Sequence, residues 1–146
     1  MLAELTRAVG LGLAIGAAFT GCGRSGEERS QAAHVLRALE VVRAAPNQAK
    51  RRPADELAHQ ACSSPIVCDT RDRCAEAYRH LAIGTEAAQR VKDELDRLEM
   101  KPPVLPEKMA ELSGALDLAD REISGAKESM RQCEEAASLM RRTFGI

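Results

Sequence analysis

A long alternation of three- and four-residue steps between apolar or small residues constrains the fold of this chain more than any other feature. The first run of such positions is Cys74, Ala77, Leu81, Gly84, Ala88, Val91, Leu95 and Leu98. The second run is Leu105, Met109, Leu112, Leu116, Ala119, Ile123, Ala126, Met130, Cys133, Ala137, Met140 and Phe144. This heptad spacing is typical of helices that lie along one another with a left-handed twist. The sequence therefore predicts two long helices whose apolar seams face each other.

The two runs are separated by the proline-rich segment 101–106, Lys-Pro-Pro-Val-Leu-Pro. Proline cannot continue a helix through its interior, whereas Pro106 suits the first turn of the helix that follows. A connection this short joins antiparallel neighbours. We therefore expect helices at 70–99 and 106–143 to form a long antiparallel, coiled-coil-like hairpin.

Two shorter helices are predicted before the hairpin, at about 27–45 and 53–62. Apolar residues recur at helical spacing in the first, and Pro53 suits the first turn of the second. We interpret Lys50-Arg51-Arg52 as a solvated linker, with contact to acidic lipid headgroups as the alternative. Because the chain has only 146 residues, 27–146 is expected to form a single domain. The predicted fold class is all-α: a disulfide-stapled helical bundle built on the hairpin.

The first 21 residues have the pattern of an export signal. Arg7 precedes an uncharged apolar run from Ala8 to Phe19, which is too short to cross a hydrocarbon layer of about 30 Å as a helix. The segment Phe19-Thr20-Gly21-Cys22 resembles the lipobox of bacterial lipoprotein precursors, in which the cysteine is lipidated and becomes the mature N-terminus.

This resemblance implies a signal peptide at 1–21, a lipidated Cys22 that holds the protein to a membrane, and a tether at 22–26. It also implies a location on the periplasmic side of the cell envelope. Gly23, where Asp would favour retention in the inner membrane, implies the outer membrane. An ordinary cleaved signal that leaves a free Cys22 is the alternative.

The five cysteines form an even set of four, Cys62, Cys68, Cys74 and Cys133, if Cys22 carries lipid. Cys74 lies 28 residues before Pro102 and Cys133 lies 30 after Pro103, so a hairpin that folds at these prolines places the two seam cysteines opposite each other. We therefore predict a Cys74–Cys133 disulfide. A Cys62–Cys68 disulfide would close the loop around Pro65, and Asp69 or Thr70 would cap the next helix.

A zinc site formed by the same four cysteines is the alternative to two disulfides. Structural zinc sites favour close pairs of ligands with two to four intervening residues. The intervals here are five, five and 58 residues. The spacing therefore favours disulfides, and we predict no metal site.

A repeated tetrapeptide marks one face of the last helix. Leu112-Ser113-Gly114-Ala115 recurs eleven residues later as Ile123-Ser124-Gly125-Ala126. Eleven residues are close to three turns, so Gly114, Ala115, Gly125 and Ala126 share a face. A glycine within a helix costs about 1 kcal/mol relative to alanine. We expect another helix to contact this face closely, namely the first helix of the chain; a kink at the Ser-Gly pairs and the helix of a partner protein are the alternatives.

The composition argues against nucleic-acid binding and offers no sign of catalysis. The net charge is −1, so the chain has no net positive field to hold nucleic acid, and an aromatic fraction of 2% leaves few side chains for base stacking. The sequence contains no nucleophile elbow or phosphate-binding glycine loop, and its three histidines, His34, His59 and His80, fit no metal or haem motif. We therefore predict a protein that is not an enzyme and has no cofactor.

Together these features predict a non-enzymatic, membrane-tethered helical module of the bacterial envelope that binds another envelope protein or itself. The alternative is a periplasmic hairpin that senses a small ligand or a metal. That alternative would need a cavity lined by Met130, Met140 or His80.

Overall fold

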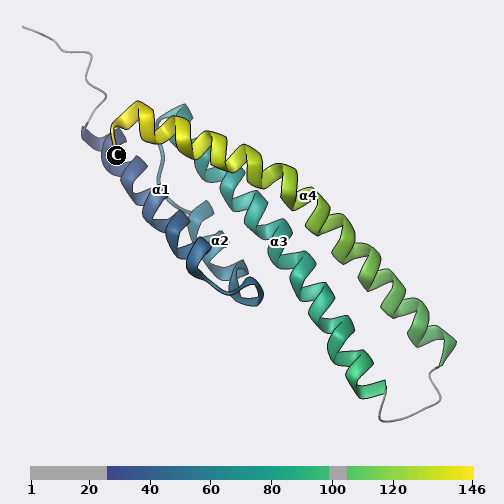
Figure 1. The fold of residues 1–146 in the computed structure, drawn as a ribbon. Helices are drawn as coiled ribbons and strands as arrows, with labels where there is room; N and C mark the ends of the chain where they lie inside the picture. Colours follow the sequence, from purple (N-terminus) through teal and green to yellow (C-terminus); the bar gives the residue numbers. More distant parts are fainter. Residues whose placement is uncertain (1–25, 99–104) are drawn as a thin grey trace, which may run out of the picture.

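The computed structural model describes residues 26–98 and 105–146, and all regular structure in these ranges is helical (Figure 1). The elements in chain order are α1 (Gly26–Ala44), the short 3-10 helix η1 (Asn47–Ala49), α2 (Arg51–Ala58), α3 (Pro65–Leu98) and α4 (Pro106–Phe144). This arrangement confirms the predicted all-α bundle built on a long hairpin. The predicted signal peptide, Cys22 and most of the tether lie outside the described residues.

Helices α3 and α4 lie side by side along their length, whereas α1 and α2 cover only part of the hairpin (Figure 1). We call 65–83 together with 127–144 the proximal half, and 84–98 together with 105–126 the distal half. The described residues of α1 and α2 pack mainly on the proximal half, where the main core cluster lies, and Arg51 of α2 and Asn47 of η1 also reach Glu86 and Thr85 at the start of the distal half. The distal half projects beyond them as a two-helix hairpin.

Both predicted disulfides are present in the structure. Cys74 and Cys133 join α3 to α4 in the proximal half, with their Cα atoms 4.6 Å apart. Cys62 and Cys68 join the segment after α2 to the start of α3, with their Cα atoms 5.3 Å apart. The hairpin is therefore cross-linked at its base and held to the segment that precedes it.

Helix α3 begins at Pro65, five residues earlier than predicted. The Cys68 N–H donates a hydrogen bond to the Ser64 carbonyl, 3.0 Å away, so Ser64 and Pro65 occupy the helix start where proline is favoured. Thr70, predicted as a cap, lies inside the helix, and its hydroxyl donates to the Ile66 carbonyl at 2.9 Å. The Cys62–Cys68 disulfide therefore ends within the first turn of α3 and does not close a separate loop.

Lys50 is buried, with only 5% of its surface exposed, so its interpretation as part of a solvated linker was wrong. Its Nζ donates hydrogen bonds to the carbonyl oxygens of Val42, Arg43 and Ala45, at 2.8, 3.0 and 2.6 Å. These carbonyls belong to the C-terminal end of α1, where a cation is favoured. Nζ also lies 5.5 Å from the centre of the Tyr78 ring. Burial lowers the pKa of Lys50 below its usual value of 10.5.

The two arginines that follow Lys50 are exposed, as expected for a solvated segment. Arg51 forms an ion pair with Glu86 of α3 at 2.9 Å, and Arg52 pairs with Glu56 of α2 at 2.8 Å. The three basic residues therefore have different roles, because only Lys50 enters the interior between α1 and α3.

We expect the ionisation of Tyr78 to lower the stability of the protein in alkaline solution. Burial raises the pKa of its phenol above 10.0, although the guanidinium of Arg43 opposes this effect. Because the unfolded phenol then ionises at lower pH than the folded one, the tyrosine's contribution to the free energy of unfolding should decline as pH rises above about 10, by at most about 1.4 kcal/mol per pH unit. Urea unfolding of the wild type and Tyr78→Phe, between about pH 8 and 11, measures this contribution as a difference. A difference that does not change with pH would contradict it.

Candidate interaction surface

One heptad row of each hairpin helix is buried along most of the hairpin. On α3 this row contains Ala77, Gly84 and Val91. On α4 it contains Leu112, Ala119, Ala126, Cys133 and Met140. Helix α4 lies close to the backbone of α3 at Gly84, where an added Cβ would lie 2.7 Å from Ile123 Cγ1 and 3.2 Å from the Ala119 carbonyl oxygen. The small residues of this row therefore allow the two helices to pack closely.

Substituting alanine at three glycines should distinguish the crowded position from two open ones. Gly84→Ala should lower the free energy of unfolding by about 1–2 kcal/mol, because overpacking against the backbone of α4 outweighs the gain in helix propensity. Gly114→Ala and Gly125→Ala should each raise it by about 0.5–1 kcal/mol, because nothing lies within 4 Å of the added carbon. Chemical denaturation measures all three, and a stabilising Gly84→Ala would contradict the close packing.

The second heptad row of each helix becomes more exposed towards the tip of the hairpin. On α4 the row runs from the buried Phe144 and Ala137, through the partly buried Met130 and Ile123, to Leu116 and Met109, which are 49% and 50% exposed. On α3 it runs from the buried Cys74, through the partly buried Leu81 and Ala88, to Leu95, which is 43% exposed. The distal half therefore leaves apolar side chains uncovered on both helices.

This exposure shows that the apolar positions of the two heptad runs are not all buried within the hairpin. The seam positions Leu95, Leu105, Met109 and Leu116 are instead exposed. The reason lies in the lengths of the helices. At 1.5 Å per residue, the 19 residues of α1 span about 28 Å and the 34 residues of α3 about 51 Å, so α1 is too short to cover the whole hairpin. A comparison of predicted helix lengths could have revealed this face from sequence.

Polar pairs border the seam between α3 and α4. His80 Nδ1 lies 2.5 Å from Glu122 Oε2, and its Nε2 lies 3.7 Å from Glu76. Nearer the tip, Lys108 Nζ lies 3.4 Å from Glu94 Oε1. Two polar pairs therefore connect the helices, His80 with Glu122 and Glu94 with Lys108. They form a polar border beside the buried row of small residues.

Helix α1 covers the second row in the proximal half. Its buried Val35 and Leu39 belong to one core cluster with Cys74, Ala137 and Phe144. Two ion pairs also join α1 to α4: Arg43 lies 2.5 Å from Glu134, and Glu40 lies 3.3 Å from Arg141. The exposed second row of the distal half is therefore a continuation of the surface on which α1 lies.

The predicted face of Gly114, Ala115, Gly125 and Ala126 is not contacted by α1. Gly114 and Gly125 are exposed, with nothing within 4 Å of an added Cβ, whereas Ala126 is buried in the seam and Ala115 is partly buried. The expected neighbour was wrong because α1 packs on the proximal half, beyond the repeated tetrapeptides. Contact with the helix of a partner protein stays a prediction.

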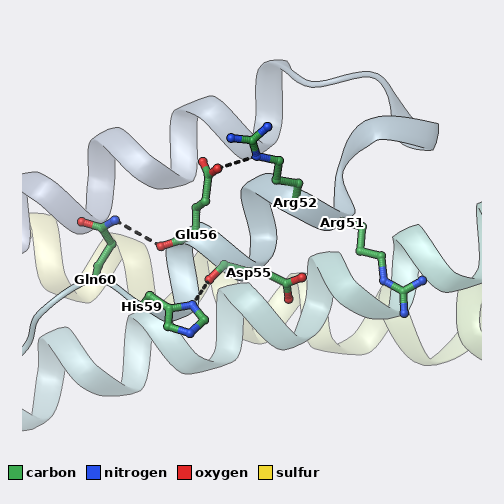
Figure 2. A pocket seen from close by; sticks show the side chains of 6 residues that line it. All are labelled: Arg51, Arg52, Asp55, Glu56, His59 and Gln60. Carbon is green, nitrogen blue, oxygen red and sulfur yellow. Dashed lines mark hydrogen bonds and ion pairs between the residues drawn. The ribbon is translucent and has the colours of Figure 1, made fainter.

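A shallow hollow on α2 is the other candidate site, and Figure 2 shows the six residues that line it. His59 Nδ1 lies 2.6 Å from the backbone carbonyl of Asp55, not from its carboxylate. The Asp55 carboxylate is 2.7 Å from Arg79, and Glu56 pairs with Arg52. Each carboxylate is therefore paired with an arginine, and the hollow brings no nucleophile to a base.

Residues that a ligand sensor would need have other roles in the described structure. Met140 is fully buried in the core cluster, Met130 packs against it, and His80 is held by Glu122. Among residues 26–98 and 105–146, no group of three His, Cys, Asp or Glu side chains is placed to hold a metal ion. Within the same ranges, no helix combines the length and the apolar character needed to span a membrane.

None of the family models, curated proteins or solved structures compared with this chain shows significant similarity to it.

Proposed function

We propose that this chain is a non-enzymatic, lipid-tethered helical module of the bacterial cell envelope that binds another protein or a second copy of itself. The observation that carries the proposal is the exposed apolar row on both helices of the distal half, where Leu95, Met109 and Leu116 are each 43–50% exposed. An exposed apolar surface that continues a packed one is typical of a site for protein–protein contact.

The cysteines support the proposed compartment. Two disulfides suit an oxidising environment such as the periplasm. They use four of the five cysteines, which leaves Cys22 for lipidation in the lipobox-like segment. No observation favours the alternative of a ligand- or metal-sensing hairpin in the same way, because Met140 and His80 are engaged in the core and in the seam.

The intact mass of the product recovered from bacterial envelopes tests this proposal. We expect a chain that begins at Cys22, carries acyl mass, and gains about four hydrogens on reduction, as two disulfides require. Cys22→Ser should lose the acyl mass but keep the gain on reduction. An unlipidated wild-type chain with free thiols would overturn both the anchor and the compartment.

A further inference from the structure

The exposed row forms a single apolar face on one side of the distal half. We call Ala88 and Leu95 of α3, with Met109, Leu116 and Ile123 of α4, the distal face. Counting back by sevens leads on α3 from Ala88 to Leu81, and counting forward leads on α4 from Ile123 to Met130. Both of these residues pack against the core cluster that contains α1. Because heptad rows stay aligned in helices that coil around each other, the distal face lies on the same side of the hairpin as α1.

The side of the distal half that carries the distal face is close in area to one half of a dimer interface. From Leu105 to Ala126, α4 rises about 32 Å, and two adjacent helices are about 20 Å wide, so the side of the distal half that carries the distal face has a footprint of about 640 Å². A stable protein–protein interface buries about 800 Å² on each partner. The footprint is thus close to what a dimer requires.

The position of α1 determines how a second copy can approach. Helix α1 lies on the second row of the proximal half and adds a further layer about 10 Å thick there. Two copies aligned in parallel would bring their α1 helices into collision. Two antiparallel copies keep their α1 helices apart, because the tip of each hairpin then lies towards the C-terminal end of the other copy's α1.

The charges around the distal face are also compatible with self-association. Lys92, Asp120 and Lys127 each follow a residue of the face by four positions and therefore border it with both signs. The whole chain carries a net charge of −1, so two copies have little net repulsion to overcome.

From these observations we infer that the partner of the distal face is a second copy of this chain, packed antiparallel about a two-fold axis near Leu116. The inference rests on the proposed binding function and names its partner. In this arrangement Leu116 lies opposite Leu116 of the second copy, and Met109 lies opposite Ile123. The two open hairpins then close into a four-helix bundle that buries the second row of every helix.

Sedimentation equilibrium of the full chain, purified from bacterial envelopes in density-matched detergent, tests the inference. We expect a reversible monomer–dimer equilibrium. Leu116→Glu should raise the dissociation constant on the order of a hundredfold or more, because each dimer would lose two buried leucines and face two carboxylates. Leu139→Glu is the matched control, because Leu139 lies on the same helix outside the distal face and is 47% exposed, against 49% for Leu116. It should change the dissociation constant by less than about twofold.

A second variant and a cross-linking experiment test the same dimer independently. Leu95→Glu should weaken the dimer as Leu116→Glu does, with the helical circular dichroism of both variants unchanged. A benzophenone amino acid at position 109 should cross-link to a second copy near Ile123. Any of four results would overturn the inference. These are a chain that stays monomeric, equal effects of the substitutions at Leu116 and Leu139, a cross-link from position 109 to position 109, and a cross-link to a different protein. A lipidated monomer would overturn this inference alone, whereas an unlipidated dimer would overturn only the proposed anchor.

Discussion

Replacing both Cys74 and Cys133 by alanine should lower the free energy of unfolding by about 4 kcal/mol. The disulfide joins residues that are 59 positions apart, and the loss of loop-closure entropy that it imposes on the unfolded chain grows with that separation. Both cysteines are fully buried in the core cluster, so their removal also leaves a small cavity. Urea unfolding of the double variant and the wild type measures the loss.

The second disulfide provides the control for this prediction. Cys62 and Cys68 are only six positions apart and are partly exposed, so the double variant Cys62→Ala and Cys68→Ala should lose about 2 kcal/mol. Equal losses from the two pairs would show that loop length does not determine their contributions. Unchanged stability without Cys74 and Cys133 would contradict the role of the long-range cross-link.

Replacing Lys50 by methionine should lower the free energy of unfolding by about 3 kcal/mol. Methionine retains the apolar length of the side chain but leaves three carbonyl oxygens at the end of α1 without their donor. Each hydrogen bond to a charged group contributes about 1.5–3 kcal/mol, and water entering the site recovers part of the total. The favourable interaction with the C-terminal end of α1 and with the Tyr78 ring is lost as well.

An exposed lysine separates the effect of burial from that of charge. Lys92 pairs with Asp96 at 3.0 Å, but its side chain is 67% exposed, and Lys92→Met should leave the free energy of unfolding almost unchanged. Thermal unfolding of both variants at neutral pH compares them directly. A loss at Lys50 no larger than that at Lys92 would show that the three carbonyl contacts do not stabilise the fold.

The hairpin and its cross-link could be predicted because they depend on short counts along the sequence. Heptad steps specify two helices, the prolines mark the turn, and counting outward from Pro102 and Pro103 brings Cys74 opposite Cys133. The start of α3 could not be predicted by the same means, because Pro65 suits either a loop or a first helical turn. The hydrogen bond to Ser64 resolves that choice in favour of the helix.

Other features depend on contacts between distant segments. The role of Lys50 requires the end of α1 and Tyr78 of α3 to meet around it, and within a run of three basic residues nothing distinguishes Lys50 from Arg51 and Arg52. The uncovered face also depends on where α1 ends against the hairpin. The repeated glycines predicted a neighbouring helix, but Gly84, which has no such repeat, is the glycine that the opposite helix approaches.

Helices α1 and α2 pack mainly on the proximal half, so the hairpin can change in length without a change in the core. Beyond Glu86 of α3 and Ala126 of α4, the hydrogen bonds and ion pairs found in the described residues lie within the hairpin, and the buried row repeats every seven residues. Adding seven residues to each helix in the distal half would therefore preserve the side-chain register while moving the tip about 10 Å further from the cross-linked base. The distal half can thus be lengthened or shortened in heptad units, so the distance from the cross-linked base to the tip of the hairpin can change while the folded base stays the same.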